Sequence, residues 1–455
     1  MIPFDALASR IPLSPVRAAL RLDPFHGGMW GDGSTASWVS RERADRAEEA
    51  DFARLPPHLR TEPDEAWERL DAGVAWNQKL NVLGALDAWR TLTAEQLAAL
   101  TGEHALASGR HRSISDLFAA RLLEIGIYRD ALRAGAKFNR GTLLRPAKPS
   151  AAVERFEQLL TYPEWVSVTG GTGFEFSRQY DRHNVLAAEL GLRVAEFCRV
   201  AAVLGEKLSA VNDLAYRGWG VPPRHAQSQQ TADMTIVRAD GLRIAVELTA
   251  SANGSMEQKM AKWAAVLADR STADSGLVVL FVIAGRPEMT GKATSLARNL
   301  RTHLARAARI FPGRRDDLTA SRMFIVDWSD WFPAGHNATR GFIDLRADRP
   351  TGAFDDPWEA CDLLDSVAVP YRPADTARPL ALLDNLAGLR SVPRWQRTGT
   401  PPELWRRVFQ RKGIAELPRI ASITDDGTRR GNLGAARGAV GPTRPVKRMV
   451  FSRPC

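Results

Sequence analysis

Hydrophobic positions in residues 80–147 recur every three or four residues, the period of helices that bury one face. The pattern predicts three short helices, over Asn81–Trp89, from Thr93 to Gly102 and over Ser113–Glu124. Thr93 and Gln96 form a capping box at the start of the second helix, and Gly102 is a typical stop. Two short extended segments follow, over 127–129 and 142–145. Three helices followed by a hairpin predict a winged-helix-like module.

The pattern changes in residues 180–335, where short apolar runs alternate with segments of helical period. Strands are expected over 234–238, 242–249, 276–284 and 323–328, and helices over 184–204, 255–269 and 290–309. Ala239-Asp240-Gly241 joins the first two strands, and Asp-Gly between apolar runs is a strong hairpin signal. This order predicts an α/β (α+β) fold with a core of mixed sheet and helices on its faces.

Three segments flank or join these patterned regions, and none of them has a core-sized period. Residues 1–79 are expected to form an irregular N-terminal extension, and residues 148–179 a connector with three glycines. Residues 336–455 form a weakly patterned C-terminal region with a basic tail from Asp425 onward. That tail is interpreted either as a nonspecific hold on DNA or as a solvated tail.

Composition narrows the class of protein. The 455 residues suggest two or three domains. A formal net charge of +10 and a pI of about 9.9 favour a polyanionic partner, with a basic solvated surface as the alternative. Three distant cysteines, Cys198, Cys361 and Cys455, indicate neither a disulfide framework nor a structural zinc site. No signal pattern and no membrane-length apolar run occurs, so a cytoplasmic protein without membrane contact is expected.

The winged-helix-like order predicts a contact with double-stranded DNA. In that arrangement the third helix lies in the major groove, where exposed side chains meet base edges. The candidates on this helix are Ser115, Asp116 and Arg121. Cations of the following loop would meet backbone phosphates: Arg133, Lys137 and Arg140. The alternative is a small helical bundle that contacts another protein.

Two acids of the predicted hairpin are candidates for a metal site. If the turn is a three-residue loop with Gly241 in the left-handed conformation, Asp233 lies directly opposite Glu247 and both point to one face. In a strict two-residue turn they point to opposite faces. Converging carboxylates suit Mg²⁺ or Mn²⁺, which prefer oxygen ligands. Solvated acids at strand ends are the alternative interpretation.

Three further residues could complete that site. Lys259 and Lys262 lie one helical turn apart on the next helix, and a lysine there would orient or deprotonate an attacking water. Glu206, upstream of the hairpin, could add a ligand from a helix.

The hairpin and its surroundings resemble the replication-relaxation family of plasmids and other mobile elements. The resemblance rests on Ala232–Val237, Ile244–Thr249 and Gln258–Trp263, and on Arg182–Ala187, which is similar to the family's histidine-bearing helix start. It covers roughly residues 80–335 and includes a winged-helix region ahead of the core. It implies a role in plasmid replication, relaxation or mobilisation, with other replication or transfer proteins as further partners.

The same core resembles the PD-(D/E)XK, restriction-endonuclease-like nuclease fold, which implies metal-dependent phosphodiester cleavage. Asp233 matches the first acid of that signature and Glu247 the second. Thr249 occupies the position of the signature lysine, and Lys259 on the following helix is the candidate replacement. Ala232 stands where the signature has proline. His183 is either an added ligand or a core histidine.

Two hypotheses therefore stand. The first is a Mg²⁺- or Mn²⁺-dependent DNA nickase or nuclease that uses Asp233, Glu247 and Lys259. The second is a non-catalytic DNA-binding regulator or scaffold with a degenerate nuclease core. The missing strand lysine favours the second hypothesis, and the retained Asp233, Glu247 and Lys259 favour the first. No Walker loop and no Gly-x-Gly-x-x-Gly after a strand occurs, which counts against a nucleotide-metabolising enzyme. The five tyrosines give no support for a covalent mechanism.

Overall fold

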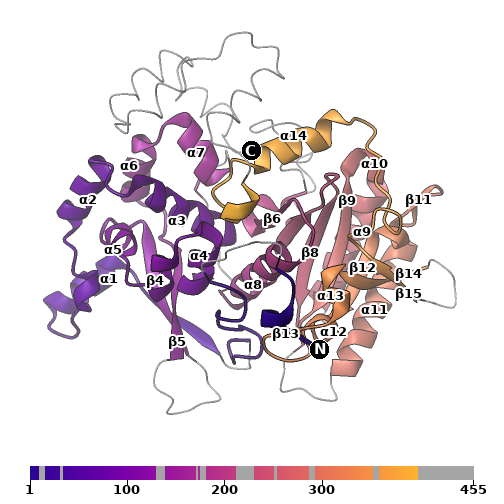
Figure 1. The fold of residues 1–455 in the computed structure, drawn as a ribbon, viewed down its shortest axis with the longest axis horizontal. Coiled ribbons are helices and arrows are strands. Elements are labelled where there is room, and N and C mark those ends of the chain that lie inside the picture. The colour runs from indigo at the N-terminus through magenta and orange to yellow at the C-terminus, as the bar shows by residue number, and fades with distance from the viewer. Residues whose placement is uncertain are drawn as a thin grey trace, which may run out of the picture.

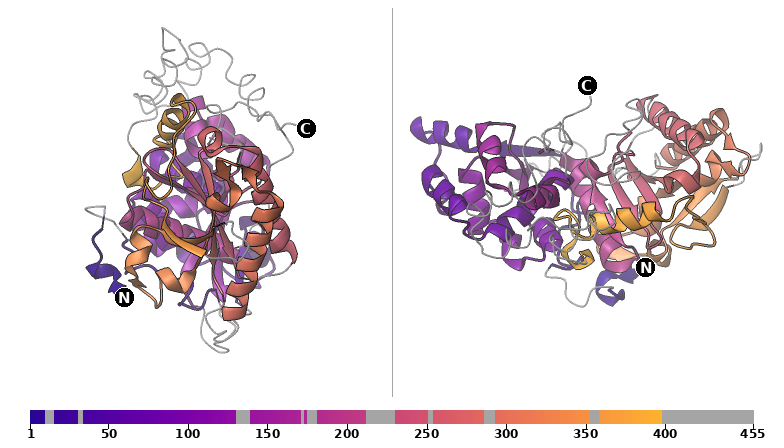
Figure 2. Two further views of the ribbon diagram at one scale, coloured as in Figure 1. Left: turned by 90° about the vertical axis from the view of Figure 1, so that its right-hand side faces the viewer. Right: turned by 90° about the horizontal axis from the view of Figure 1, so that it is seen from above.

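The computed structural model describes residues 1–9, 16–30, 34–129, 139–170, 173–174, 181–211, 230–250, 254–285, 293–351 and 358–397. The chain folds around two main sheets, one in each lobe of the molecule (Figure 1). Seen from above, the lobes lie side by side along the longest axis (Figure 2). The fold is mixed α/β, with a mixed sheet and helices on its faces, as the alternation of apolar patterns predicts.

The first lobe carries a four-stranded antiparallel sheet with the order β2-β4-β5-β3. Its strands are β2 (Thr35–Val39), β3 (Leu92–Thr93), β4 (Leu123–Arg129) and β5 (Asn139–Pro146). Its helices are α1 (Arg41–Glu49), α2 (Pro63–Asp71), α3 (Trp76–Trp89), α4 (Ala94–Thr101), α5 (Arg112–Ala119), α6 (Ala151–Leu159) and α7 (Tyr162–Thr169). Short 3₁₀ turns are η2 (Pro57–Leu59) and η3 (His104–Ser108).

Local signals set the ends of α4. The Thr93 hydroxyl accepts from the Gln96 amide at 3.1 Å, and the Gln96 side chain accepts from the Thr93 amide at 3.1 Å. Gly102 ends the helix with a φ of +77°, so the predicted capping box and stop are both confirmed. The third predicted helix ends earlier than expected, because Arg121 has a φ of 60° and the chain then enters β4.

The second lobe carries a seven-stranded sheet with the order β15-β14-β12-β9-β8-β7-β6. Its strands are β6 (Ala202–Gly205), β7 (Met234–Val237), β8 (Arg243–Thr249), β9 (Leu277–Ile283), β12 (Met323–Asp327), β14 (Arg346–Pro350) and β15 (Trp358–Asp362). Strands β8, β9 and β12 are parallel neighbours, and the other pairings are antiparallel.

Helices cover both faces of this sheet. They are α8 (Asp181–Phe197), α9 (Gly254–Asp269), α10 (Thr272–Ser275), α11 (Ala293–Ile310), α12 (Trp328–Trp331), α13 (Arg340–Ile343) and α14 (Ala377–Leu386). Trp263 of α9 and Leu300 of α11 pack with Phe281 on one face. Leu186 of α8 shares the main core with Val246 on the other face. Among the described helices, none combines the length and apolar character needed to cross a membrane.

The remaining described elements are small. They are β1 (Ile2–Pro3), β10 (Gly313–Arg314), β11 (Asp317–Leu318), β13 (Asn337–Ala338), η1 (Phe4–Ala6), η4 (Glu206–Leu208), η5 (Thr319–Arg322) and η6 (Arg394–Gln396).

Tertiary contacts correct the interpretation of residues 1–79 as an irregular extension. Within them β1 pairs with β13, and β2 pairs with β4 of the first lobe. Phe4, Trp30 and Trp67 are buried. The residues that these three side chains contact lie far away in the sequence, so no local periodicity predicts their burial. Residues 148–179, expected to be a connector, likewise include α6 and α7.

The second lobe requires two similar corrections. The helix expected over 184–204 ends at Phe197, and Ala202–Gly205 instead forms the edge strand β6 against β7. The weakly patterned residues after 335 add β14 and β15 to the sheet. Both strands are short and carry charged residues on exposed positions, so they lack a clear apolar alternation. The basic tail lies outside the described residues.

One hydrophobic core runs through both lobes, and helix α3 connects them. The Trp89 ring at the end of α3 lies so close to α8 that a Cβ on Gly191 would come within 2.5 Å of it. The Trp89 indole also donates to the Ser391 carbonyl at 2.9 Å. Glycine at position 191 therefore allows the two lobes to pack against each other.

Buried ion pairs fasten the N-terminal segment 16–30 to α8. Arg21 bonds Glu189 at 3.1 Å and also pairs with Glu196. Arg193 bonds Glu189 and Asp23, both at 3.0 Å. Burial raises the pKa of Glu196, whereas the two arginines more than offset burial at Glu189 and lower its pKa. Such a network is costly to break on one side, because the partner charges stay buried.

Replacing Arg21 with Ala tests this network. Glu189 and Glu196 would remain buried without their main partner, so the free energy of unfolding should fall by about 3–5 kcal/mol. Urea denaturation followed by tryptophan fluorescence measures the change. Arg17→Ala is the matched control, since Arg17 is exposed on the same segment and its loss should change stability by less than about 0.5 kcal/mol. Equal midpoints for the two variants would contradict the assignment.

Candidate functional site

The β7–β8 hairpin places Asp233 opposite Glu247. Met234 pairs with Val246, and the Asp233 amide continues the ladder by donating to the Val246 carbonyl at 3.0 Å. The turn is a three-residue loop, in which Gly241 has a φ of +85° and the Arg238 amide donates to Leu242 at 2.8 Å. The first of the two turn geometries is therefore realised, and both acids lie on the same face of the sheet.

Strand directions bring the candidate acids to one edge of the sheet. Strands β6, β8, β9 and β12 run in the same direction, so their carboxyl ends share an edge with the start of β7. Glu206 directly follows β6, Asp233 precedes β7 and Glu247 lies near the end of β8. Ligand sites in open α/β sheets typically lie outside this kind of edge.

Glu247 is fully buried and meets two donors from α9. Its Oε1 accepts from the Trp263 indole at 2.7 Å, and its Oε2 forms an ion pair with the Lys259 ammonium. Burial, together with repulsion from Asp233, raises the pKa of Glu247 to about 8 in spite of Lys259. At neutral pH this carboxyl is therefore largely protonated, and a nearby cation would favour its ionised form.

Asp233 and Lys259 lie beside Glu247. We call these three residues, Asp233, Glu247 and Lys259, the acid–lysine cluster. Asp233 Oδ2 accepts from the Leu248 amide at 2.7 Å, which holds the side chain over the end of β8. Burial alone would lower the pKa of Lys259, but Glu247 and Asp233 more than offset it and raise that pKa. The Lys259 side chain is 31% exposed, so it connects the buried Glu247 with solvent.

A histidine and a tryptophan border the acid–lysine cluster. The rings of His183 and Trp30 meet edge to face with centroids 4.9 Å apart, and the Trp30 indole donates to the Ala284 carbonyl at 2.7 Å. Burial lowers the pKa of His183, and Lys259 adds to that effect while Asp233 opposes it. His183 is therefore a neutral imidazole at neutral pH. The sequence gives little sign of Trp30, whose only signal is a tryptophan within a glycine-rich stretch.

Glu206 does not join Asp233 and Glu247 as a third potential metal ligand. Its Oε2 accepts from the Asn184 amide group at 3.1 Å, although it still raises the pKa of Lys259 through space. Within the described residues, no three His, Cys, Asp or Glu side chains come close enough together to hold a metal ion. A divalent ion at the acid–lysine cluster would therefore take two carboxylates from the chain and complete its shell with water or substrate oxygens.

The expected base-reading face of the third helix, α5, is covered. Ser115 and Asp116 are buried, which makes the expectation of exposed side chains there wrong. The Ser115 hydroxyl donates to the His58 carbonyl of η2, and Asp116 forms ion pairs with Arg69 of α2 at 2.6 Å and with Lys79 at 2.8 Å. The physical reason is that α2 and η2, distant in sequence, pack on α5.

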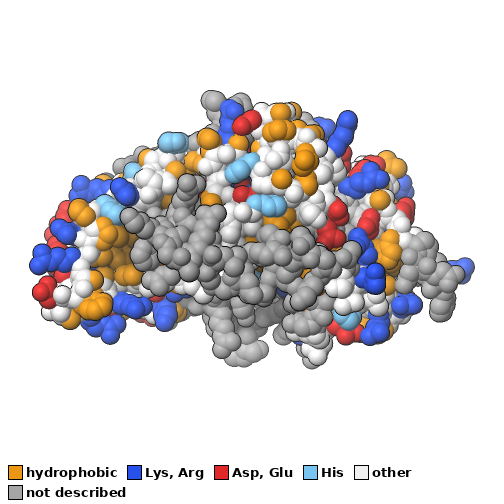
Figure 3. Space-filling view, turned by 90° about the horizontal axis from the view of Figure 1, so that it is seen from below, with side chains coloured by type: hydrophobic (Ala, Val, Ile, Leu, Met, Phe, Trp, Pro, Cys, Tyr) orange, Lys and Arg blue, Asp and Glu red, His pale blue; other side chains and the backbone are white. Residues whose placement is uncertain are grey.

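The other candidate DNA contacts have mixed outcomes. Arg121 lies two residues beyond α5, has a 46% exposed side chain and pairs with Glu42 at 3.4 Å. Arg140 lies on β5, but its side chain is outside the described residues, as are Arg133 and Lys137. On the face drawn in Figure 3, basic side chains occur on both lobes and are mixed with acidic ones. Charge alone therefore does not mark a DNA surface there.

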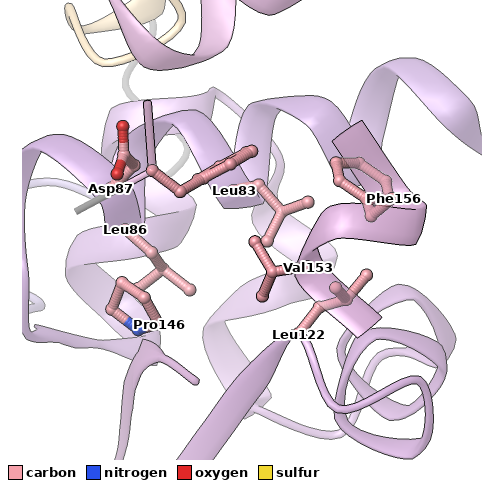
Figure 4. Close-up of a pocket in the computed structure, with 8 residues that line it drawn as sticks. Leu83, Leu86, Asp87, Leu122, Pro146, Val153 and Phe156 are labelled. Carbon is pink, nitrogen blue, oxygen red and sulfur yellow. The ribbon is translucent and has the colours of Figure 1, made fainter. Parts of the chain in front are cut away.

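A small hollow in the first lobe is not a substrate site. It measures about 10 Å³, which holds no more than about one water molecule. Its lining is apolar apart from Asp87, and Leu83, Val153 and Phe156 line it (Figure 4). Asp87 is already paired with Lys207, which also donates to the Gly173 carbonyl at 2.9 Å.

No protein-family model, curated protein or solved structure matches this chain. The chemistry of the site is therefore argued from its own residues.

Replacing Glu247 with Gln should stabilise the protein increasingly as the pH rises from 5 to 8. The folded pKa of about 8 lies above the unfolded value of about 4.5, so burying the ionised carboxylate costs stability across that window. The amide keeps an acceptor for Trp263 and carries no charge. We expect Glu247→Gln to raise the free energy of unfolding by about 1–2 kcal/mol at pH 8. Each unit of pKa shift corresponds to at most about 1.4 kcal/mol.

Urea denaturation at pH 5, 6.5 and 8 measures this difference. Asp269→Asn is the matched control, because Asp269 is an acid on the same helix α9 with a 78% exposed side chain. Its variant should show no trend with pH relative to the unsubstituted protein. A pH-independent difference for Glu247→Gln would contradict a carboxyl held largely protonated by burial.

Proposed function

We propose that this protein cleaves DNA with a divalent metal ion, nicking it in plasmid or mobile-element replication, relaxation or mobilisation. The observation that carries the proposal is the acid–lysine cluster, in which two opposed carboxylates and a lysine meet at the carboxyl edge of a sheet. Asp233 and Glu247 match the two acids of the PD-(D/E)XK signature, and Lys259 takes the place of the strand lysine.

The donor set fits Mg²⁺ or Mn²⁺. Both candidate ligands offer hard carboxylate oxygens, and the buried Oε2 atom of Glu247 pairs with the Lys259 ammonium. When bound, an ion of this class lowers the pKa of a coordinated water and offsets charge on a phosphate. Asp233 and Glu247 would hold it.

Other side chains of the protein would position water and substrate. Lys259 reaches from buried Glu247 to solvent, so it can orient a water molecule and neutralise a phosphate oxygen. Asp233 is held in place by the Leu248 amide, which limits the ordering cost of binding a cation. The helices α3, α4 and α5 with the β4–β5 hairpin follow the winged-helix order that motivates DNA as the substrate, although α2 and η2 cover the face of α5 that carries Ser115 and Asp116.

Nicking of supercoiled plasmid in the presence of Mg²⁺ or Mn²⁺ tests this proposal. Asp233→Asn and Glu247→Gln should each reduce nicking by at least about 100-fold, because even groups around metal ligands cost roughly 10–100-fold when lost. Lys259→Gln should also abolish most activity, whereas Lys262→Gln, an exposed lysine one turn further along α9, should not. Asp269→Asn serves as the acid control.

The rate should rise as the pH increases from 6 to 8. Glu247 binds a cation only when ionised, and its pKa of about 8 sets the upper end of that rise. Raising the Mn²⁺ concentration should move the midpoint to lower pH, because the cation competes with the proton. A rate that does not change with pH over this range would remove Glu247 from the set of ligands.

A non-catalytic DNA-binding regulator or scaffold is the second candidate. The specific observation in its favour is that Lys259 already occupies the Oε2 atom of Glu247, while Thr249 occupies the strand position of the signature lysine. Gel-shift measurements at two salt concentrations separate the candidates. Salt-sensitive DNA binding without nicking in any metal would favour the scaffold.

A further inference from the structure

Three arginines gather within eight residues at the junction of the two lobes: Arg390, Arg394 and Arg397. The segment that carries them is attached to both lobes. The Arg390 amide donates to the Ser167 carbonyl of α7 at 2.8 Å. The Gln396 side chain accepts from the Val203 amide of β6 at 3.2 Å, and the Trp395 indole donates to the Ala195 carbonyl of α8 at 3.3 Å. The backbone that presents this arginine cluster is therefore held in place by several separate elements.

Within the described part of the chain, the guanidinium groups of Arg390 and Arg397 donate hydrogen bonds only to neutral oxygens. Arg390 donates to the Asn81 side chain at 2.7 Å and to the Asn77 side chain at 3.2 Å, while its Nε is buried without a partner. Arg397 donates to the same Asn81 oxygen at 3.2 Å and to the Arg390 carbonyl at 2.7 Å. Arg394 is exposed, and its side chain lies over the end of α4, where a Cβ on Gly102 would come within 2.5 Å of it.

Several buried arginines of the described chain meet carboxylates, as Arg21 and Arg193 do at Glu189, whereas Arg243 donates to the Val211 and Ser275 carbonyls. No salt bridge to any of the three clustered arginines occurs in the described part of the chain. Glu164 acts on Arg390 through space, but its two oxygens accept from Trp76 at 2.7 Å and from Thr161 at 2.9 Å.

Burial and mutual repulsion lower the pKa of Arg390 to about 10 and that of Arg397 to about 9. Positive charge held together in this way is unfavourable, and an added anion would relieve it.

We propose that Arg390, Arg394 and Arg397 form a binding site for a phosphate-class oxyanion. Planar guanidinium forks match phosphate oxygens in pairs, and the exposed Arg394 makes no side-chain hydrogen bond within the described chain. The anion is either a phosphate of a nucleic acid or free inorganic phosphate. This site lies against α3 and β6, apart from the acid–lysine cluster, and it does not depend on the proposed cleavage.

Binding of inorganic phosphate to the full chain, by calorimetry at constant ionic strength against chloride, is the first experiment. Arg394→Ala should weaken binding about tenfold or more, and Arg394→Lys should give an intermediate loss, because it keeps charge without the fork. Arg309→Ala is the matched control, an exposed arginine of α11 that should leave binding unchanged. Arg394 donates no hydrogen bond within the described chain, so its removal should leave the fold intact.

Duplex DNA in metal-free buffer is the second arm and distinguishes the two sources of the anion. If the site takes backbone phosphate, Arg394→Ala should weaken DNA binding and reduce the salt slope by about one. If it takes free phosphate, only phosphate binding should fall. Equal behaviour of Arg394→Ala and the unsubstituted protein toward both ligands would overturn the proposal. Because no nicking is measured, that outcome is separate from a failure of the proposed cleavage.

Discussion

The ion pairs that Glu189 makes with Arg21 and Arg193 join the N-terminal segment 16–30 to α8. They lie on α8, which also contacts α3 through Gly191 and carries His183 on its first turn. The guanidinium of Arg193 lies 4.6 Å from the Phe332 ring, so the same network reaches the residues that follow β12. Because these charges are shielded from water, their partners must remain in place, and the N-terminal segment stays against the sheet.

The fixed position of the N-terminal segment also affects the candidate site at the edge of the seven-stranded sheet. The segment held by Arg21 and Asp23 includes Trp30, which contacts His183 and bonds Ala284 beside the acid–lysine cluster. A buried network with no chemistry of its own therefore shapes one wall of the candidate site. At the acid–lysine cluster the change in pKa has the opposite sign. The pKa of Glu247 is raised and that of Glu189 is lowered, because positive charges compensate less for the burial of Glu247. A group held at a cost to stability is common where function requires its altered pKa.

Sequence patterns predicted the elements that depend on local chemistry. The capping box at Thr93 and the strands on both sides of Gly241 need only neighbouring residues, and each lies close to where the pattern puts it. The register of that hairpin stayed open because it depended on the turn, and the left-handed Gly241 decided it in favour of opposed acids. Helical spacing after the hairpin left both Lys259 and Lys262 as candidates, and the nuclease resemblance favoured Lys259, which pairs with Glu247.

Contacts between distant segments account for what the patterns missed. Asp116 has the pattern of a polar surface residue on an amphipathic helix, yet its partners Arg69 and Lys79 lie more than one element away. Strand β6 follows an Ala- and Leu-rich helix without a break in composition, and only its pairing with β7 makes it extended. Trp30 has little local signal beyond its glycine-rich surroundings, because its contacts are with residues far along the chain.

Net charge illustrates the same difference between composition and placement. A formal charge of +10 suggested a polyanionic partner, but many of the described arginines are paired with acids, as Arg69, Arg145 and Arg301 are. A paired arginine contributes little to binding a phosphate, since its donors and its field are already used. The cations that matter are those packed together without an ion-paired acid, and in the described part of the chain Arg390, Arg394 and Arg397 meet that condition at the junction of the lobes. The electrostatic argument for an anionic partner therefore rests on this cluster more than on the total charge.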